Sequence, residues 1–257
     1  MRRFDPRAAA SALLTLAVVC ADLAVADPVL PLPADDAREI AKNLGDGVVG
    51  KPLPAPVITD AAAYFPLVER SLVYRVTVGT NLGQSQTLRL AKGRRPGGSP
   101  AWRFQISPSL SAFLSQTDDG DLLMPAISDF DEGVVVVTTP PNAFVLRGMQ
   151  PGESRPFTQT VSVDYLDQPD KQDWGGTLSG TFTYVGAYEV TVLAGTFETV
   201  LLRTKCEGKI GPAHTEDTAY YFLARDVGVV AMVTQEDAEA FWVVNIDTTI
   251  GKTLVSK

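Results

Sequence analysis

The sequence has 257 residues, of which 45% are hydrophobic and 20% are charged, and its formal net charge is −8. This apolar content is sufficient for a folded core, and the acidic balance disfavours a nucleic-acid partner. One histidine and two cysteines leave little material for zinc sites, Cys–His nucleophile pairs or a disulfide framework. We therefore predict a protein with no cofactor, no metal ligands and no catalytic residues.

The first 26 residues have the features of an export signal. Arginines in the first seven residues precede an uncharged apolar run over residues 8–21, which is short for a membrane span. The small side chains of Ala24 and Ala26 fit a signal peptidase. We expect cleavage after Ala26, no integral membrane span in the mature protein, and a location in the periplasm or outside the cell. The alternatives are a retained anchor helix and lipid attachment at Cys20, which the bulky Val19 disfavours.

Residues 27–56 form a proline-rich arm. Its prolines remove backbone donors and fix φ, so neither proline cluster is expected inside a sheet. Between the clusters, apolar residues recur at helical spacing over Asp35–Leu44, an aspartate can cap the start, and Gly45 can close the end. The segment lacks the large apolar residues and basic face of a membrane-surface helix.

Residues 57–257 are predicted to form one antiparallel β domain. Apolar and polar residues alternate from Leu67 onward, which is typical of strands with one buried face. Cys206 lies in such an alternation, so we interpret it as a thiol packed on a strand. Strands are expected at 72–78, 85–90, 102–106, 134–137, 161–165, 178–185, 188–193, 197–206, 218–224, 228–234 and 241–248.

The breaks between these strands have turn chemistry, as at Asp119-Gly120 and Gly97-Gly98. One short helix is expected within Ser107–Gln116. Many short strands with few helices predict a mainly β fold, an antiparallel curved sheet that forms a half-barrel or a barrel-like sheet. A membrane β-barrel is the competing interpretation, but the strands are shorter and less regular than such barrels require.

Candidate catalytic groups are few. His214 is the only imidazole, and we place it in an exposed hairpin loop without a nucleophile. The acidic runs Asp118–Asp121 and Asp129–Glu132 lack the spacing of a calcium-binding loop, and we interpret them as solvated turns. A hydrolase that uses these carboxylates alone remains a minor alternative.

Two segments of the C-terminal third resemble a known pattern. Residues 188–200 (YEVTVLAGTFETV) and 219–230 (AYYFLARDVGVV) are similar to a motif of uncharacterised exported bacterial β-proteins, a domain of unknown function. The resemblance covers about residues 65–257, and the chain departs from the pattern at Leu193, where proline is frequent, and at Asp226, where glycine is common. Such domains resemble the half-barrel of periplasmic lipoprotein-localisation factors. The resemblance implies a curved sheet and carries over no active site.

We therefore expect a non-enzymatic protein that binds an apolar ligand, either a lipid or a lipoprotein segment, in a concave sheet. The alternative is a structural module of envelope assembly that contacts another envelope protein through its sheet edges and proline-rich arm. The candidate ligand-binding residues are large side chains in one alternating phase, namely Tyr74, Val76, Trp102, Phe104, Phe182, Tyr184, Tyr221 and Trp242.

Overall fold

The computed structural model describes residues 26–240 and 244–257. Residues 1–25 of the predicted signal segment, which include Cys20, and the candidate Trp242 lie outside these residues. Two short helices and thirteen strands follow one another along the described chain. In chain order they are α1 (Ala34–Leu44), β1 (Val49–Leu53), α2 (Ala61–Tyr64), β2 (Arg70–Val78), β3 (Ser85–Arg94), β4 (Pro100–Gln105), β5 (Leu110–Gln116), β6 (Leu122–Asp129), β7 (Val134–Val145), β8 (Ser154–Tyr165), β9 (Gln168–Val192), β10 (Gly195–Ile210), β11 (Ala213–Ala224), β12 (Gly228–Ala240) and β13 (Val244–Ser256).

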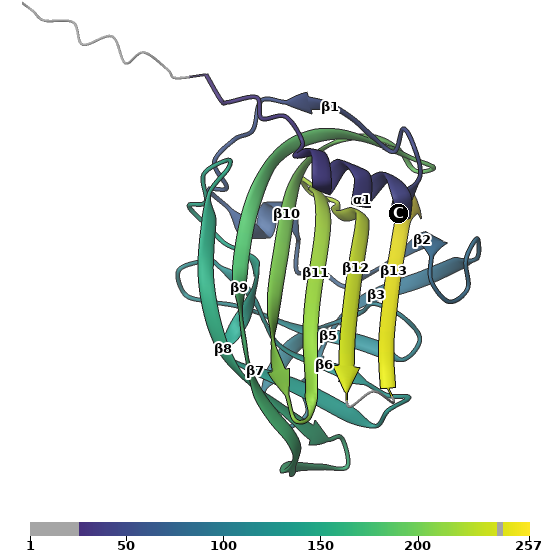
Figure 1. Ribbon diagram of the computed structural model, residues 1–257. Helices are drawn as coiled ribbons and strands as arrows, with labels where there is room; N and C mark the ends of the chain where they lie inside the picture. Colours follow the sequence, from purple (N-terminus) through teal and green to yellow (C-terminus); the bar gives the residue numbers. More distant parts are fainter. Residues whose placement is uncertain (1–25, 241–243) are drawn as a thin grey trace, which may run out of the picture.

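The sheet closes on itself as an antiparallel barrel (Figure 1). Strands β2 to β13 pair in the order β9-β10-β11-β12-β13-β2-β3-β4-β5-β6-β7-β8, and β8 pairs again with β9. The fold is therefore mainly β, a closed 12-strand barrel with two short helices. The prediction of a curved antiparallel sheet is confirmed in its barrel-like form, because a half-barrel would leave β8 and β9 unpaired with each other.

Strand β9 makes closure geometrically feasible because it is long and strongly curved (Figure 1). Its first part pairs with β8, its last part pairs with β1, and β10 pairs with it on the other side. A Cβ added at Gly180 would lie 2.1 Å from the carbonyl oxygen of Lys205, and one at Gly208 would lie 2.0 Å from that of Thr177. Only glycine permits this approach of two backbones, as at other barrel corners.

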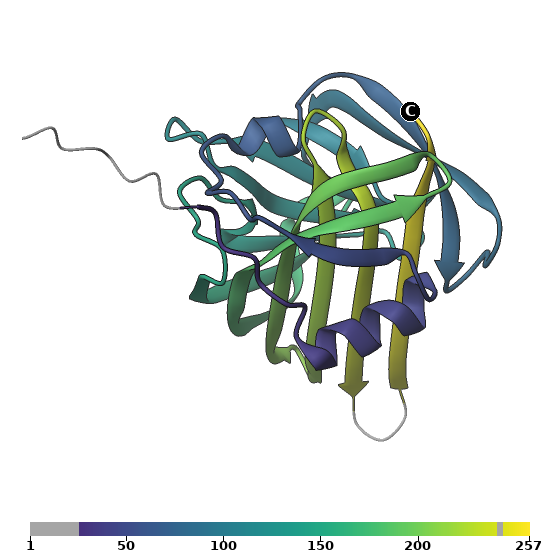
Figure 2. The same cartoon turned by 90° about the horizontal axis from the view of Figure 1, so that it is seen from above.

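Helix α1 lies across the outer surface of β11, β12 and β13 (Figures 1 and 2). The sequence predicted this helix over Asp35–Leu44, and the structure confirms it with one further residue. Strand β1 contains Pro52 and pairs on one side only, with β9, as expected of a proline-bearing edge strand.

The barrel core is filled by side chains. Phe65, which follows α2, contacts Phe104 at 5.4 Å and Phe144 at 4.9 Å between ring centroids, and Phe144 contacts Tyr221 at 5.4 Å. All three contacts have the edge-to-face geometry that aromatic pairs prefer. These rings belong to one large hydrophobic cluster that includes strands from both walls of the barrel.

Two sequence expectations are wrong. The helix expected within Ser107–Gln116 is instead a turn followed by strand β5. The amide of Leu110 donates to the Ser107 hydroxyl at 3.0 Å, and β5 pairs with β4 and β6. His214 does not lie in a loop, because β11 begins at Ala213 and His214 already pairs with Lys209. In both places, pairing with neighbouring strands decided the conformation.

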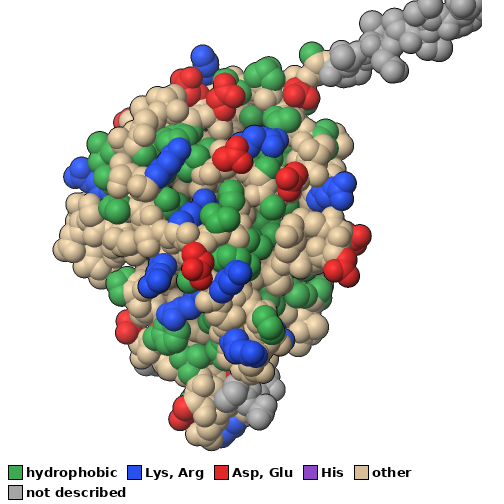
Figure 3. Space-filling model, turned by 180° about the vertical axis from the view of Figure 1, so that it is seen from behind, with side chains coloured by type: hydrophobic (Ala, Val, Ile, Leu, Met, Phe, Trp, Pro, Cys, Tyr) green, Lys and Arg blue, Asp and Glu red, His purple; other side chains and the backbone are tan. Residues whose placement is uncertain are grey.

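Charges of both signs are interspersed with apolar side chains on the face shown in Figure 3. Among residues 26–240 and 244–257, no helix combines the length and apolar character required to cross a membrane.

Candidate functional site

The candidate ligand-binding residues named from the sequence contribute to the core. Tyr74, Phe104, Phe182 and Tyr184 are fully buried, as is Val76, and Trp102 and Tyr221 are partly buried. The two buried tyrosines have hydroxyl partners within the chain. The Tyr74 hydroxyl donates to the Val229 carbonyl at 2.6 Å, and the Tyr184 hydroxyl donates to the Pro56 carbonyl at 2.9 Å. Burial raises the pKa of both phenols. Their polar atoms are thus already engaged in holding the fold together.

The cavity beside these residues is small. Tyr74 and Phe104 line a space of about 10 Å³ together with Phe65, Arg70 and three leucines. This volume is enough for about one water molecule. The structure therefore brings Tyr74 and Phe104 together around a space that is too small for a lipid chain.

A much larger cavity, of about 420 Å³, lies where the proline-rich arm meets the end of the barrel. This volume falls within the range of small-molecule sites in proteins. Its walls come from the arm, α2, β9, β10 and the turn between β11 and β12. The lining residues are Asp27, Leu53, Pro54, Pro56, Tyr64, Ala187, Glu198, Thr199, Val200 and Arg225. We refer to it as the arm cavity.

The walls of the arm cavity are fixed by backbone contacts. The arm bridges to itself between Val29 and Pro54, and the Tyr184 hydroxyl holds the Pro56 carbonyl. The amide of Asp226 donates to the Ala63 carbonyl at 2.7 Å, which ties the β11–β12 turn to α2. Because proline also restricts the arm backbone, we expect the cavity to be largely preformed.

The arm cavity is chemically mixed. Leu53, Val200 and the prolines supply apolar surface, and Glu198 and Arg225 bring charged groups of opposite sign. Both charged residues are exposed, and the Arg225 guanidinium lies 5.0 Å from the centre of the Tyr64 ring. An apolar wall with a few charged groups at its rim is suited to an amphipathic ligand.

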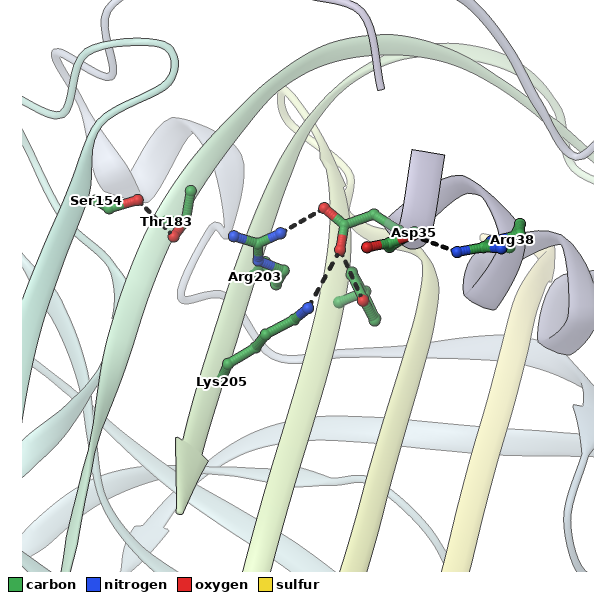
Figure 4. Close-up of polar contacts among 8 residues, drawn as sticks. Asp35, Arg38, Ser154, Thr183, Arg203 and Lys205 are labelled. Atoms are coloured by element: carbon green, nitrogen blue, oxygen red, sulfur yellow. Dashed lines mark hydrogen bonds and ion pairs between the residues drawn. The ribbon is translucent and has the colours of Figure 1, made fainter. Parts of the chain in front are cut away.

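The arm is also anchored through Asp36 on α1, whose side chain is 1% exposed. Its carboxylate accepts from Arg203 Nη1 at 2.5 Å and from the Tyr220 hydroxyl at 2.9 Å, and Lys205 Nζ lies 3.5 Å away. Figure 4 shows Arg203 and Lys205 pointing from β10 toward the helix. The neighbouring Asp35 lies on the exposed side and pairs with Arg38. Three elements of the fold, α1, β10 and β11, are thus joined at one carboxylate.

This contact also identifies the inner face of β10 and β11. Because Arg203, Lys205 and Tyr220 point outward to α1, residues in the alternate phase, such as Cys206 and Asp217, point into the barrel. The Cys206 sulfur lies 3.8 Å from Asp217 Oδ2. Burial, followed by the nearby charge of Glu236, raises the pKa of Asp217 to about 7. Burial also raises the pKa of the Cys206 thiol to about 12.

The sequence interpretation singled out Cys206 as a strand-packed thiol and missed Asp217. Asp217 shares the two-residue period of Thr215 and Tyr221 on β11, and this period is the signal that could have placed Asp217 on the inner face. Lys252 was missed as well; it is 1% exposed, its amine contacts the Ile106 carbonyl, and burial lowers its pKa to about 8.

The two acidic runs form turns, as predicted. In the first run, Asp121 Oδ1 accepts from the backbone amide of Arg147 at 2.7 Å. In the second, Asp129 Oδ1 accepts from the amides of Asp131 and Glu132 at 2.9 and 3.2 Å. Asp129 thus stabilises its own turn, whereas Asp121 ties the β5–β6 connection to the connection that follows β7.

Comparisons with known proteins identify no family. No family model matches the chain, and no curated protein sequence matches it. Two solved structures are similar at low scores. A candidate lipoprotein from Parabacteroides distasonis is 10% identical with a TM-score of 0.35, covering 77% of this chain and 99% of that one. The hypothetical lipoprotein YmcC from Escherichia coli is 11% identical with a TM-score of 0.32, covering 88% of this chain and 97% of that one.

Proposed function

We propose that this protein is an exported, non-enzymatic binding protein whose ligand occupies the arm cavity. The observation that carries the proposal is the volume of about 420 Å³ at the junction of the arm and the barrel. The space beside Tyr74 and Phe104 in the barrel core is only about 10 Å³. We therefore place the ligand at the arm and not in the concave sheet, where the sequence had suggested it. Export rests on the basic start, apolar run and small residues of the first 26 residues.

The ligand that fits best is an amphipathic molecule such as a lipid. The apolar part of such a ligand would contact Leu53 and Val200. Its polar end would lie at Arg225 and Glu198, which are exposed and carry opposite charges. A zwitterionic or hydrogen-bonding head group complements this pair better than a strongly anionic one, because Asp27 adds a second carboxylate to the lining.

The alternative role, partner binding through sheet edges, has less support. Closure of the barrel leaves β1 as the strand that pairs on one side, among the residues described. That edge carries Lys51 and Pro52, and both residue types protect edges against added strands.

The test is binding of an environment-sensitive fluorescent lysophosphatidylcholine, a single-chain lipid with a zwitterionic head group, to the purified protein. We expect saturable binding that Arg225→Ala weakens at least roughly tenfold, which corresponds to about 1.4 kcal/mol. Arg89→Ala is the matched control, because Arg89 is an exposed arginine on β3 that does not belong to the lining of the arm cavity. A wild-type protein that takes up no probe, or equal affinities for all three proteins, would contradict the proposal.

A second variant tests the apolar wall. Val200 is 2% exposed and contributes to the cavity lining, so Val200→Phe should reduce the volume and the affinity. Its thermal unfolding is measured beside binding, so that loss of fold and loss of the site are separated. A folded Val200→Phe variant with unchanged affinity would place the ligand elsewhere.

A further inference from the structure

The only histidine of the chain lies beside two glutamates on the outer face of the barrel. His214 and Glu216 are two residues apart on β11, and Glu207 on β10 pairs directly with Glu216. The Nε2 atom of His214 lies 3.6 Å from Glu216 Oε1. One donor atom from each of the three residues lies within 4.8 Å of the other two. We propose that these residues form a site for a divalent transition-metal ion such as Zn²⁺.

The spacing suits a metal ion after small side-chain movements. Zinc binds imidazole nitrogen and carboxylate oxygen at about 2.0–2.2 Å, so tetrahedral ligands lie about 3.4 Å from one another. His214 and Glu216 are already near this separation. All three side chains are exposed and able to rotate, so the remaining approach requires no backbone change.

The backbone beneath the site is fixed. The donors lie on two strands that pair without interruption from Thr199 to Ile210. The turn that joins them is held by β9, because the amide of Gly211 donates to the Gly175 carbonyl at 2.9 Å. The Trp174 ring packs against this turn, since a Cβ at Gly211 would lie 2.5 Å from the ring. A fixed platform reduces the entropy lost when three ligands converge on one ion.

The electrostatics also favour a cation. Glu207 and Glu216 face each other across the strands, and Asp237 pairs with Glu216 on the far side. Like charges directly opposite are destabilising in a sheet. Lys209 pairs with His214, yet no ion pair between Lys209 and either glutamate is found among the described residues. A divalent ion would neutralise this row.

The ligand set selects the class of metal. An imidazole with two carboxylates suits Zn²⁺, Ni²⁺ or Cu²⁺, whereas Mg²⁺ and Ca²⁺ prefer sites made of oxygen alone. Three protein ligands leave one tetrahedral position for water or for an atom from another molecule. The site lies on the outer face, whereas the arm cavity is lined by other residues, so this proposal is independent of the proposed function.

The experiment is isothermal titration of the tag-free protein with ZnCl₂, compared with CaCl₂. We expect saturable one-to-one Zn²⁺ binding that His214→Ala weakens by roughly tenfold or more, because loss of even an outer-shell partner has such an effect. Glu207→Gln and Glu216→Gln should each weaken it similarly. Glu132→Gln is the control, since it removes the same charge from an exposed position outside the cluster.

Because the chain has one histidine, its imidazole NMR signals report on the site without ambiguity. They should shift with Zn²⁺ in the wild type and in Glu132→Gln, and much less at the same Zn²⁺ concentration in Glu216→Gln. Absence of saturable Zn²⁺ binding would overturn the proposal. So would an affinity that His214→Ala leaves unchanged, or Ca²⁺ binding as tight as Zn²⁺ binding, because either result would indicate a non-specific acidic surface.

Discussion

The contact between Asp36 and the barrel allows a direct test of how the arm is held. In Asp36→Asn the side chain keeps its shape and loses its charge, while Arg203 keeps its own. Asp36 is 1% exposed, Arg203 is 19% exposed and Lys205 is 45% exposed. Solvent therefore screens the charges of the two basic residues in part, but it hardly reaches the carboxylate of Asp36. Removing one partner of a buried ion pair costs about 3–5 kcal/mol. We expect a loss near the lower limit, about 3 kcal/mol, because the two basic groups retain access to water.

The measurements are urea unfolding and thermal unfolding, both followed by circular dichroism, together with hydrogen exchange of the α1 amides. For a chain of this size, a loss of about 3 kcal/mol lowers the melting temperature by roughly 6–12 °C. Asp35→Asn is the matched control. Its side chain is 83% exposed and its partner Arg38 is 78% exposed, so it should lose less than about 1 kcal/mol. If Asp36→Asn changes neither stability nor α1 exchange, or if Asp35→Asn has the same effect, the buried carboxylate of Asp36 does not hold the arm.

Three further predictions concern the barrel wall. The pKa of Asp217 is raised to about 7 in the folded protein from an ordinary value of 3.8. The folded protein therefore binds this proton more tightly than the unfolded chain does, and the protonated carboxyl group contributes to stability at low pH. This contribution is lost as the pH rises from about 4 to about 7. Asp217→Asn should therefore gain stability relative to wild type between pH 5 and pH 8 in urea unfolding, and a stability difference that stays constant over this range would contradict the prediction. Burial raises the pKa of the Cys206 thiol to about 12, so little of the reactive thiolate is present at pH 8. We expect Cys206 to react with a thiol-specific disulfide reagent at pH 8 roughly 100-fold more slowly than a free thiol does. A rate close to that of the free thiol would contradict this prediction. An added Cβ at Gly208 would lie 2.0 Å from a backbone oxygen, so Gly208→Ala should lose more than about 4 kcal/mol, whereas Gly97→Ala, with φ at +84° and open space, should lose about 1–2 kcal/mol by chemical denaturation.

Local chemistry explains which elements were predictable. The apolar spacing over Asp35–Leu44 and the closing Gly45 correctly placed α1. Alternation along β2 and β10 correctly indicated strands, because side-chain period depends on the chain itself. The failure at Ser107–Gln116 arose from a segment whose pattern fits a helix or a strand, and pairing with β4 and β6 decided between them.

The candidate site was less accessible to sequence reasoning. Alternation identified Tyr74 and Phe104 as inward-facing residues, which the structure confirms, but it could not show that Phe65 fills the space between them and the far wall. The arm cavity depends on residues from Asp27 to Arg225, which no local pattern connects. Likewise, Glu207 meets His214 and Glu216 only through the register of β10 against β11.

Local patterns in the sequence were enough to predict the strand-rich class, the helix over Asp35–Leu44 and the proline-restricted arm. Only the tertiary structure decided that the sheet closes, through a curved β9 that pairs with β8, β10 and β1. It also decided that Asp36 meets Arg203 and Tyr220, far along the chain. The physical reason is that alternation reports which face of a strand is buried, whereas curvature, register and packed volume depend on strands distant in the sequence.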